Sequence, residues 1–160
     1  MSETMPAWVH QGNRPATDSG YLSNLTRCVF QAGLNWTLVA SKWPGFESAF
    51  DGFDVDKVAA YGADDISRLN NDAAIIRNKR KILATIHNAR EIQRISAEHS
   101  GFQAWLDSIP KTNNYDQVVK RLRSTLKHVG PGTAHIFLWS VGEPIKYDES
   151  VHSRRPKKIA

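Results

Sequence analysis

The stretch Leu126–Ala134, LKHVGPGTA, decides the fold expected for this chain. A basic helical segment, YDQVVKRLRSTLKH, precedes the turn, and an apolar helical segment, TAHIFLWSV, follows it at once. Proline suits the first position of a helix, and glycine lets the backbone turn sharply and approach a ligand closely. The stretch therefore predicts two helices joined by a tight hairpin, with the positive end of the second helix open to an anion.

Basic residues beside this hairpin make a nucleic-acid phosphate the anion that we expect there. Four of them lie within residues 120–127, just upstream of the backbone N–H groups that would contact the phosphate. An ordinary glycine turn between two helices explains the same residues, since such connections are common. The residues predicted to contact nucleic acid are Arg123, Lys127, His128, Val129, Gly130, Pro131, Gly132 and Thr133.

Helical spacing of apolar residues also runs through the rest of the chain. Asp54 is an expected N-cap, and Pro44-Gly45 predict a turn between two short helices. Because neither strand-like alternation nor a repeat occurs, the sequence predicts an all-α fold of many short helices. Before the hairpin pair, helices are expected over residues 21–32, 36–42, 46–50, 54–62, 64–71, 78–99 and 101–109.

Three segments are expected along the 160 residues, which have the length of a single domain with a real core. Residues 1–20 are polar and rich in turn residues, and they predict an irregular N-terminal arm. Residues 21–150 form the expected helical domain. Residues 151–160 are basic, and we expect them to form a flexible tail.

The composition, with 41% hydrophobic and 23% charged residues, is typical of a soluble globular protein. The sequence contains neither an apolar run of transmembrane length nor a signal-peptide pattern, and its one cysteine, Cys28, excludes an internal disulfide. We therefore expect a cytoplasmic monomer. Of the net charge of +5, four charges come from the last seven residues, so the local patches at 77–81 and 120–127 indicate a polyanion partner better than the total does.

Two long patterns resemble the 3-methyladenine DNA glycosylase I family. They are QAGL-x-W, at residues 31–36, and IIRN-x-x-KI-x-A-x-x-x-NA, at residues 75–89. Helix formation requires neither pattern, and the hairpin VGPGTA stands where that family has its helix–hairpin–helix motif. The similarity covers about residues 20–142. It implies a helix–hairpin–helix DNA glycosylase of base-excision repair, which removes an alkylated purine such as 3-methyladenine from double-stranded DNA.

The resemblance also implies which residues form the base pocket. A base in duplex DNA must be flipped into a pocket before its glycosidic bond is accessible, and a methylated purine stacks well on tryptophan. Trp36 matches a pocket tryptophan of the family, Gln31 lies five residues earlier, and Trp8 in the arm is a further candidate wall. A plain core position is the alternative for Trp36. The tryptophans expected in the core are Trp43, Trp105 and Trp139.

Cys28 stands eight residues before Trp36, where the family carries a glutamate that contacts the damaged base. A thiol offers no full negative charge to a cationic purine unless its pKa is strongly lowered. We therefore expect Cys28 to border the base and recognition of 3-methyladenine to be weakened or changed. A small buried core residue is the alternative for Cys28.

Other departures from the family concern the chemistry. The family ties its termini with a zinc ion, whereas this chain has no cysteine near either end, so we expect no metal and no cofactor. Related helix–hairpin–helix enzymes carry a lyase lysine where this chain has Gly132, which indicates a monofunctional hydrolase. Asp148 falls roughly where those enzymes carry an aspartate and is the candidate catalytic residue, with a surface aspartate as the alternative. A non-catalytic DNA-binding protein that has lost the glycosylase chemistry is the alternative function.

Overall fold

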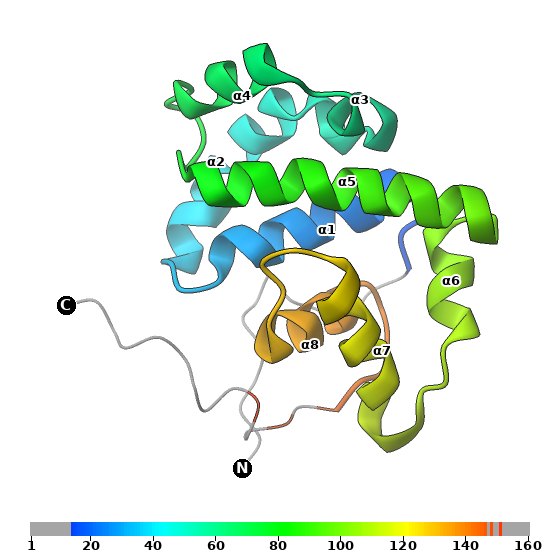
Figure 1. The fold of residues 1–160 in the computed structure, drawn as a ribbon. Helices are drawn as coiled ribbons and strands as arrows, with labels where there is room; N and C mark the ends of the chain where they lie inside the picture. Colours follow the sequence, from blue (N-terminus) through cyan, green and yellow to red (C-terminus); the bar gives the residue numbers. More distant parts are fainter. Residues whose placement is uncertain (1–13, 147, 149–150, 152–160) are drawn as a thin grey trace.

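Every regular element is helical within residues 14–146, 148 and 151, which the computed structural model describes (Figure 1). The all-α fold predicted from the sequence is therefore confirmed. The elements are α1 (Asp18–Gln31), α2 (Trp36–Ala49), the short 3-10 helix η1 (Asp51–Phe53), α3 (Val55–Ala59), α4 (Ala63–Asn70), α5 (Lys79–His99), α6 (Phe102–Ser108), α7 (Thr112–Thr125) and α8 (Pro131–Ser140).

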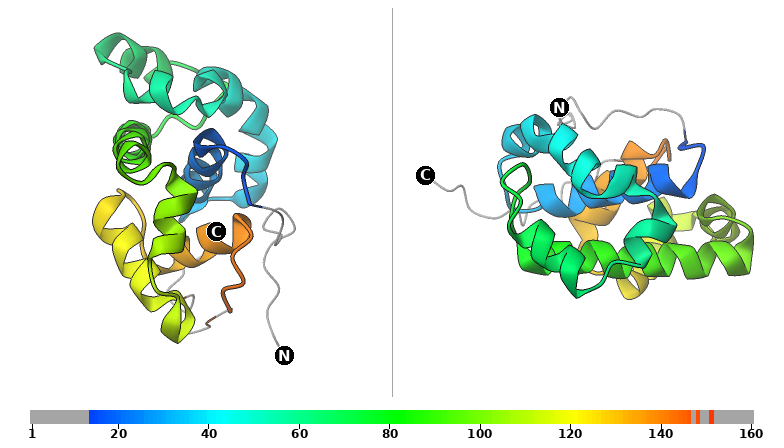
Figure 2. Two further views of the ribbon diagram at one scale, coloured as in Figure 1. Left: turned by 90° about the vertical axis from the view of Figure 1, so that its right-hand side faces the viewer. Right: turned by 90° about the horizontal axis from the view of Figure 1, so that it is seen from above.

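The long helix α5 crosses the molecule, and the other helices are arranged around it (Figure 1). Helices α3 and α4 pack on one side of α5, and α1 packs against it between these helices and the α7–α8 pair (Figure 2). Leu22, Leu25 and Phe30 of α1 have no exposed surface. Helix α1 is therefore the central helix, and its last residue, Gln31, ends inside the molecule.

Asp54 caps a helix as predicted, and Asn78 caps another. The Asp54 carboxylate accepts a hydrogen bond from the backbone N–H of Lys57 at 3.0 Å, at the start of α3. The Asn78 side chain accepts one from the N–H of Lys81 at 3.1 Å, at the start of α5. A side-chain oxygen in this position satisfies one of the N–H groups that a helix leaves unpaired at its first turn. Local sequence therefore fixes the start of α5, which carries the basic segment 77–81.

The predicted turn at Pro44-Gly45 is wrong, because α2 runs through both residues without interruption. Interior proline costs a helix about 3 kcal/mol, whereas burying each large apolar side chain contributes about 1.5–3 kcal/mol. Several such side chains lie on one face of α2, so burial outweighs the proline. A Cβ atom on Gly45 would collide with the backbone of Ala74, so the glycine serves close packing here. The buried residues of α2 are Val39, Trp43, Phe46 and Ala49.

Two of the further differences from the predicted helix boundaries bear on the site. Helix α1 begins at Asp18, so residues 18–20 of the predicted arm are helical. Helix α7 ends at Thr125, so Lys127 and His128 belong to the connection rather than to the basic helix. The reason is tertiary, since the side chain of Asn88 binds the backbone of Lys127 and holds it out of the helix.

Arg14 joins the start of the described chain to two distant elements. Its guanidinium forms an ion pair with Asp107 of α6 and donates to the Glu143 carboxylate, after α8, at 3.1 Å. Glu143 is 3% exposed and also accepts from the Tyr115 hydroxyl at 2.9 Å. A buried carboxylate with two strong donors is well satisfied. The segment at Arg14 is therefore anchored beside the end of α8.

Trp43 and Trp105 lie in the core as predicted, and Trp139 is partly buried against it. Among the described helices, none is both long and apolar enough to span a membrane.

Candidate nucleic-acid interface and base pocket

The connection between α7 and α8 is a tight hairpin, as the sequence predicts. After Leu126 the backbone extends, His128 adopts a left-handed conformation with φ of 60°, and Pro131 opens α8. Histidine is one of the residues that tolerate this conformation better than most. The side chain of Val129 packs into the core, so only its backbone could face a ligand. Lys127 and His128 are exposed.

The N-terminus of α8 is open. Gly130 is its N-cap, and no side chain caps the first turn. The backbone of Gly130 is extended, with φ of −88° and ψ of −178°, a conformation open to any residue. A Cβ atom at Gly130 would meet no heavy atom of the protein within 4 Å. Neither conformation nor internal packing therefore requires glycine, and its small size matters only to a molecule that approaches from outside.

Asn88 of α5 fixes the shape of the hairpin. Its side chain accepts from the backbone N–H of Lys127 at 2.8 Å and donates to the Lys127 carbonyl at 3.2 Å. The ring of His87 lies 3.3 Å from the Thr125 carbonyl. The backbone N–H and carbonyl of Lys127 are thus both hydrogen-bonded to the buried side-chain amide of Asn88, in the pattern seen between neighbouring β-strands. The hairpin is positioned by α5 before any ligand arrives.

The basic start of α5 lies beside the hairpin. Partial desolvation lowers the pKa of the exposed His128 ring, and the nearby charges of Lys81 and Arg80 act in the same direction. Arg77, Lys79 and Arg80 are exposed. Two basic segments that are far apart in the sequence therefore meet on one face, and Figure 1 shows the hairpin and the start of α5 on the same side of the molecule. A face of this kind suits a phosphate backbone.

Lys81 connects this face with the end of α1. Its ammonium donates to the carbonyls of Phe30 and Ala32, at 3.2 and 2.8 Å, which are unpaired carbonyls at the C-terminal end of the helix. Lys81 is 7% exposed, and burial lowers its pKa to about 8. A cation at a helix C-terminus is favoured by the helix dipole. Lys81 thus ties the residues on both sides of Gln31 to α5.

The Gln31 side chain has an unusual environment. It is 1% exposed, and neither its oxygen nor its nitrogen has a hydrogen-bond partner. Leaving such a group unpaired costs about 1–3 kcal/mol. Its backbone, by contrast, is hydrogen-bonded, because the Gln31 carbonyl accepts from the indole N–H of Trp36 at 2.9 Å. The structure therefore places these two predicted pocket residues in contact.

Trp36 is half-buried at the start of α2 and lies outside the buried core cluster. Asn35 caps this helix through a 3.2 Å bond to the N–H of Leu38. The hydrogen bond from the indole N–H to the Gln31 carbonyl holds one end of the ring. This arrangement differs from the plain core position that was the alternative for Trp36.

Cys28 lies one turn before Gln31 on α1 and is 3% exposed. Burial raises the pKa of its thiol to about 12, although a hydrogen bond with Ser140 and the charge of Arg27 act in the opposite direction. The thiol is neutral at physiological pH and is no nucleophile. The burial agrees with the alternative of a core residue, and contact with a base remains a prediction.

The remaining predicted site residues have less support. Asp148 is half-buried, and its backbone carbonyl accepts from the N–H of Val151 at 3.1 Å. Trp8 lies outside the described residues. Among the described residues, no cluster of histidine, cysteine and carboxylate side chains could hold a metal ion.

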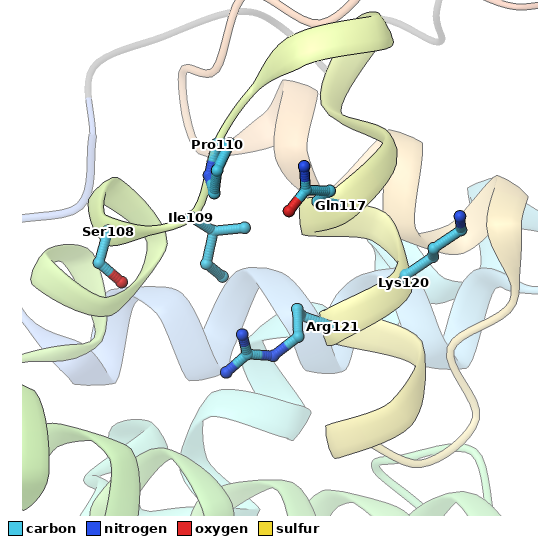
Figure 3. Close-up of a pocket in the computed structure, with 6 residues that line it drawn as sticks. All are labelled: Ser108, Ile109, Pro110, Gln117, Lys120 and Arg121. Carbon is cyan, nitrogen blue, oxygen red and sulfur yellow. The ribbon is translucent and has the colours of Figure 1, made fainter.

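Figure 3 shows an open pocket of about 280 Å³ between the end of α6 and α7. None of the predicted base-pocket residues lines it. Arg121 lies beside this pocket, with its guanidinium over the Trp105 ring at 5.7 Å. The residues that line it are Ser108, Ile109, Pro110, Gln117, Lys120 and Arg121.

Sequence reasoning missed Lys81 and Asn88 as residues that organise the site. Lys81 was counted as one of several exposed cations, and Asn88 only as part of a pattern. Both lie within the segment 75–89, whose asparagine and lysine are not required by helix formation. Both also belong to the pattern by which this segment resembles the family, and that was the available signal.

An all-α bundle that presents such a hairpin is the arrangement predicted for a helix–hairpin–helix DNA glycosylase. Residues 10–145 match the family model described as methyladenine glycosylase. The chain therefore belongs to the methyladenine glycosylase family.

Two relatives and one solved structure illustrate the similarity. The chain is 35% identical over 122 residues to DNA-3-methyladenine glycosylase 1 of Escherichia coli, covering 75% of this chain and 63% of the relative. It is 28% identical over 130 residues to DNA-3-methyladenine glycosylase of Haemophilus influenzae, covering 70% of each chain. The fold is similar to that of 3-methyladenine DNA glycosylase I from Staphylococcus aureus, with a TM-score of 0.73 at 24% identity over 88% of this chain and 87% of that chain.

Proposed function

We propose that this protein is a monofunctional DNA glycosylase, which hydrolyses the N-glycosidic bond of an alkylated purine in double-stranded DNA. One observation carries the proposal: Gln31, whose side-chain amide is buried and unpaired, accepts through its backbone carbonyl from the Trp36 indole, and Lys81 ties both neighbours of Gln31 to the helix that positions the open hairpin. The names of the relatives support the same activity, 3-methyladenine DNA glycosylase.

The residues would divide the work between holding DNA and holding the base. The N–H groups at the start of α8, together with Lys127, Arg123 and the basic start of α5, would contact phosphates without reading sequence. The flipped purine would stack on Trp36 and reach Gln31, beside Cys28. These contacts with the enclosed base would offset the free energy that its unstacking costs.

The reaction is a hydrolysis. The bond between C1′ of the sugar and the purine nitrogen breaks, and the base leaves with the bonding electrons. Water adds its oxygen to C1′ and loses a proton to solvent. A purine that carries a positive charge from N-alkylation leaves as a neutral base, so the protein mainly has to bind, flip and orient it. Gly132 supplies no amine at the hairpin, so a lyase step is not expected. We also propose that Asp148 takes part in activating the water.

The test is release of alkylated bases from methylated duplex DNA, measured by chromatography, beside affinity for a duplex with an abasic site. Release of a methylated purine with an intact sugar–phosphate strand is the expected result. Tight binding without release would instead show the DNA-binding protein that has lost its chemistry.

We further infer that the protein acts as a cytoplasmic monomer, whose folded domain begins with α1 at Asp18 and ends near residue 150, with an arm before it and a tail after it. Its lone cysteine suits a reducing compartment. Sedimentation of the free protein and of its complex with one duplex would test the monomer, and fractionation of cells would test the compartment.

A further inference from the structure

Arg121 of α7 faces the pocket between α6 and α7 with its hydrogen-bond donors unused. Its side chain points from α7 toward α6, and its guanidinium lies over the Trp105 ring at 5.7 Å (Figure 3). Within the part of the chain that the structure describes, no carboxylate or carbonyl accepts from it. Stacking uses the face of a guanidinium and leaves the N–H groups at its edge available to an anion. Trp105 therefore holds a cation in place for a negatively charged partner.

The other charges around this pocket are already paired. The ammonium of Lys120 lies 3.1 Å from the Asp116 carboxylate, one helical turn earlier on α7. Beyond Pro110, the ammonium of Lys111 lies 3.5 Å from the Asp107 carboxylate. An anion that enters the pocket would therefore be attracted chiefly by the guanidinium, and charge complementarity would select an acidic partner.

One wall of the pocket is apolar. Ile109 and Pro110, where the chain leaves α6, form this wall together with the aliphatic stems of Lys120 and Arg121. Gln117 adds an amide one turn before Arg121, on the same face of α7. The volume of about 280 Å³ is just below the about 300–1,000 Å³ of sites that enclose small molecules. The pocket therefore suits one or two side chains of a larger partner.

Two anions match a guanidinium through paired hydrogen bonds, phosphate and carboxylate. The apolar wall separates them. A hydrated phosphate gains nothing from such a wall, whereas an apolar side chain is stabilised by leaving water. A peptide that carries carboxylates beside an apolar residue would use both the cation and the wall. The chemistry of the pocket therefore favours an acidic peptide over the backbone of DNA.

The pocket is also separate from the proposed DNA face. Helix α6 follows the C-terminal end of α5, whereas the hairpin lies beside the start of α5 (Figure 1). None of the residues predicted to contact DNA or the flipped base lines the pocket. A partner bound between α6 and α7 would therefore leave the DNA face accessible.

We propose that the pocket between α6 and α7 is a docking site for an acidic segment of another protein. An apolar side chain of that segment packs against Ile109 and Pro110, and a neighbouring carboxylate accepts paired hydrogen bonds from Arg121. The partner binds while the hairpin is engaged with DNA. This inference goes beyond the proposed function and does not depend on it, because the pocket shares no residue with the base site.

The experiment uses the full chain and three labelled hexapeptides. EELFEE carries carboxylates and apolar side chains, QQLFQQ lacks the charges, and EEGGEE lacks the apolar side chains. Arg121→Met removes the charge and keeps an unbranched side chain against Trp105. Arg123→Met is the matched control, since Arg123 is exposed on the same helix and does not line the pocket. Fluorescence anisotropy at fixed salt measures each affinity, and backbone-amide NMR locates the bound peptide.

We expect the native protein to bind EELFEE on the order of 10-fold or more tightly than either other peptide, since each of these lacks one kind of contact. Arg121→Met should lose about 10-fold or more of the affinity for EELFEE, and Arg123→Met should keep it. The amide signals of residues 108–121 should shift on binding. Failure of the native protein to bind EELFEE, or equal binding by Arg121→Met, would overturn the proposal. The three peptides test the native protein alone, so the proposal can be refuted even if a variant does not fold.

DNA is the competitor in this experiment. An undamaged duplex should leave EELFEE bound, and displacement of the peptide from residues 108–121 would show that the pocket holds phosphate instead. Base release from methylated duplex DNA should be the same for Arg121→Met and the native protein. A native protein that binds EELFEE through Arg121 but releases no base would contradict the glycosylase activity and support the docking site. Normal base release without binding of EELFEE would support the activity and refute the docking site.

Discussion

The phosphate clamp at the hairpin can be tested by adding a side chain to Gly130. We choose Gly130→Val, because the extended backbone there suits valine and a Cβ atom meets no protein atom within 4 Å. Valine is a poorer N-cap than glycine, so stability should fall by about 1 kcal/mol, and affinities are compared between folded proteins. A phosphate has to approach the N–H groups of α8 to about 2.7–3.2 Å, a distance at which the new side chain would obstruct it.

The size of the expected effect follows from the hydrogen bonds at risk. A hydrogen bond to a charged group contributes about 1.5–3 kcal/mol, so losing one at the clamp should weaken DNA binding roughly 10- to 150-fold. The loss should be the same for duplexes of different sequence, because phosphate contacts carry no sequence information. Fluorescence anisotropy with abasic-site duplexes at fixed salt measures it, since affinity depends steeply on salt.

Gly62 provides a matched control for this experiment. It is the N-cap of α4, its backbone is also extended, and a Cβ atom there also meets no heavy atom within 4 Å. Gly62→Val should leave DNA affinity unchanged. If Gly130→Val is folded and binds abasic DNA as tightly as the native protein, α8 does not hold a phosphate and the interface is misplaced.

Three further substitutions test the base pocket and the hairpin. Trp36→Ala should abolish base release and cost about 1–3 kcal/mol of binding if the indole stacks on the base; a steep fall in melting temperature with normal activity per folded molecule would place Trp36 in the core instead. Cys28→Glu should speed release of 3-methyladenine while lowering thermal stability, because a carboxyl would be buried where the thiol is 3% exposed; rapid native release that the variant slows would show that the family's glutamate has no counterpart here. Partial desolvation and the charges of Lys81 and Arg80 lower the pKa of His128 in the free protein. A bound phosphate would favour the protonated imidazole. DNA affinity should therefore rise as pH falls from neutral into the mildly acidic range. His128→Asn, which tolerates the left-handed backbone, should remove this pH dependence, and a native affinity that does not vary with pH would exclude a contact between the imidazole and phosphate.

Local signals in the sequence predicted most helix starts and the hairpin, because capping and turn residues act over a few positions. Asp54 and Pro131 each stand at the start of the helix that they predict, and the long helix begins directly after Asn78, within the expected range 78–99. The continuity of α2 through Pro44 could not be predicted in this way, since it depends on how much apolar surface the rest of the fold buries against that helix. The tertiary packing outweighed the local signal.

The organisation of the site was predicted only in part, for the same reason. Patterns in the sequence selected Gln31 and Trp36, but the bonds that hold them arise between distant segments. Lys81 meets Ala32 across 49 positions, and Asn88 meets Lys127 across 39. Nothing in helical periodicity states which buried amide is paired and which is not, so the unpaired state of Gln31 required the three-dimensional structure.

The pairing of Asn88 with the backbone of Lys127 has a kinetic consequence. A hairpin held in its final shape needs no rearrangement to engage phosphates, so encounters with undamaged DNA can be brief and frequent, at rates set by diffusion and charge. Gln31, by contrast, is covered until the structure around it opens locally, and local opening takes microseconds or longer. The molecule would therefore search along the duplex quickly and inspect a base slowly, so that only a base that leaves the stack readily, or stays out long enough, is examined at all.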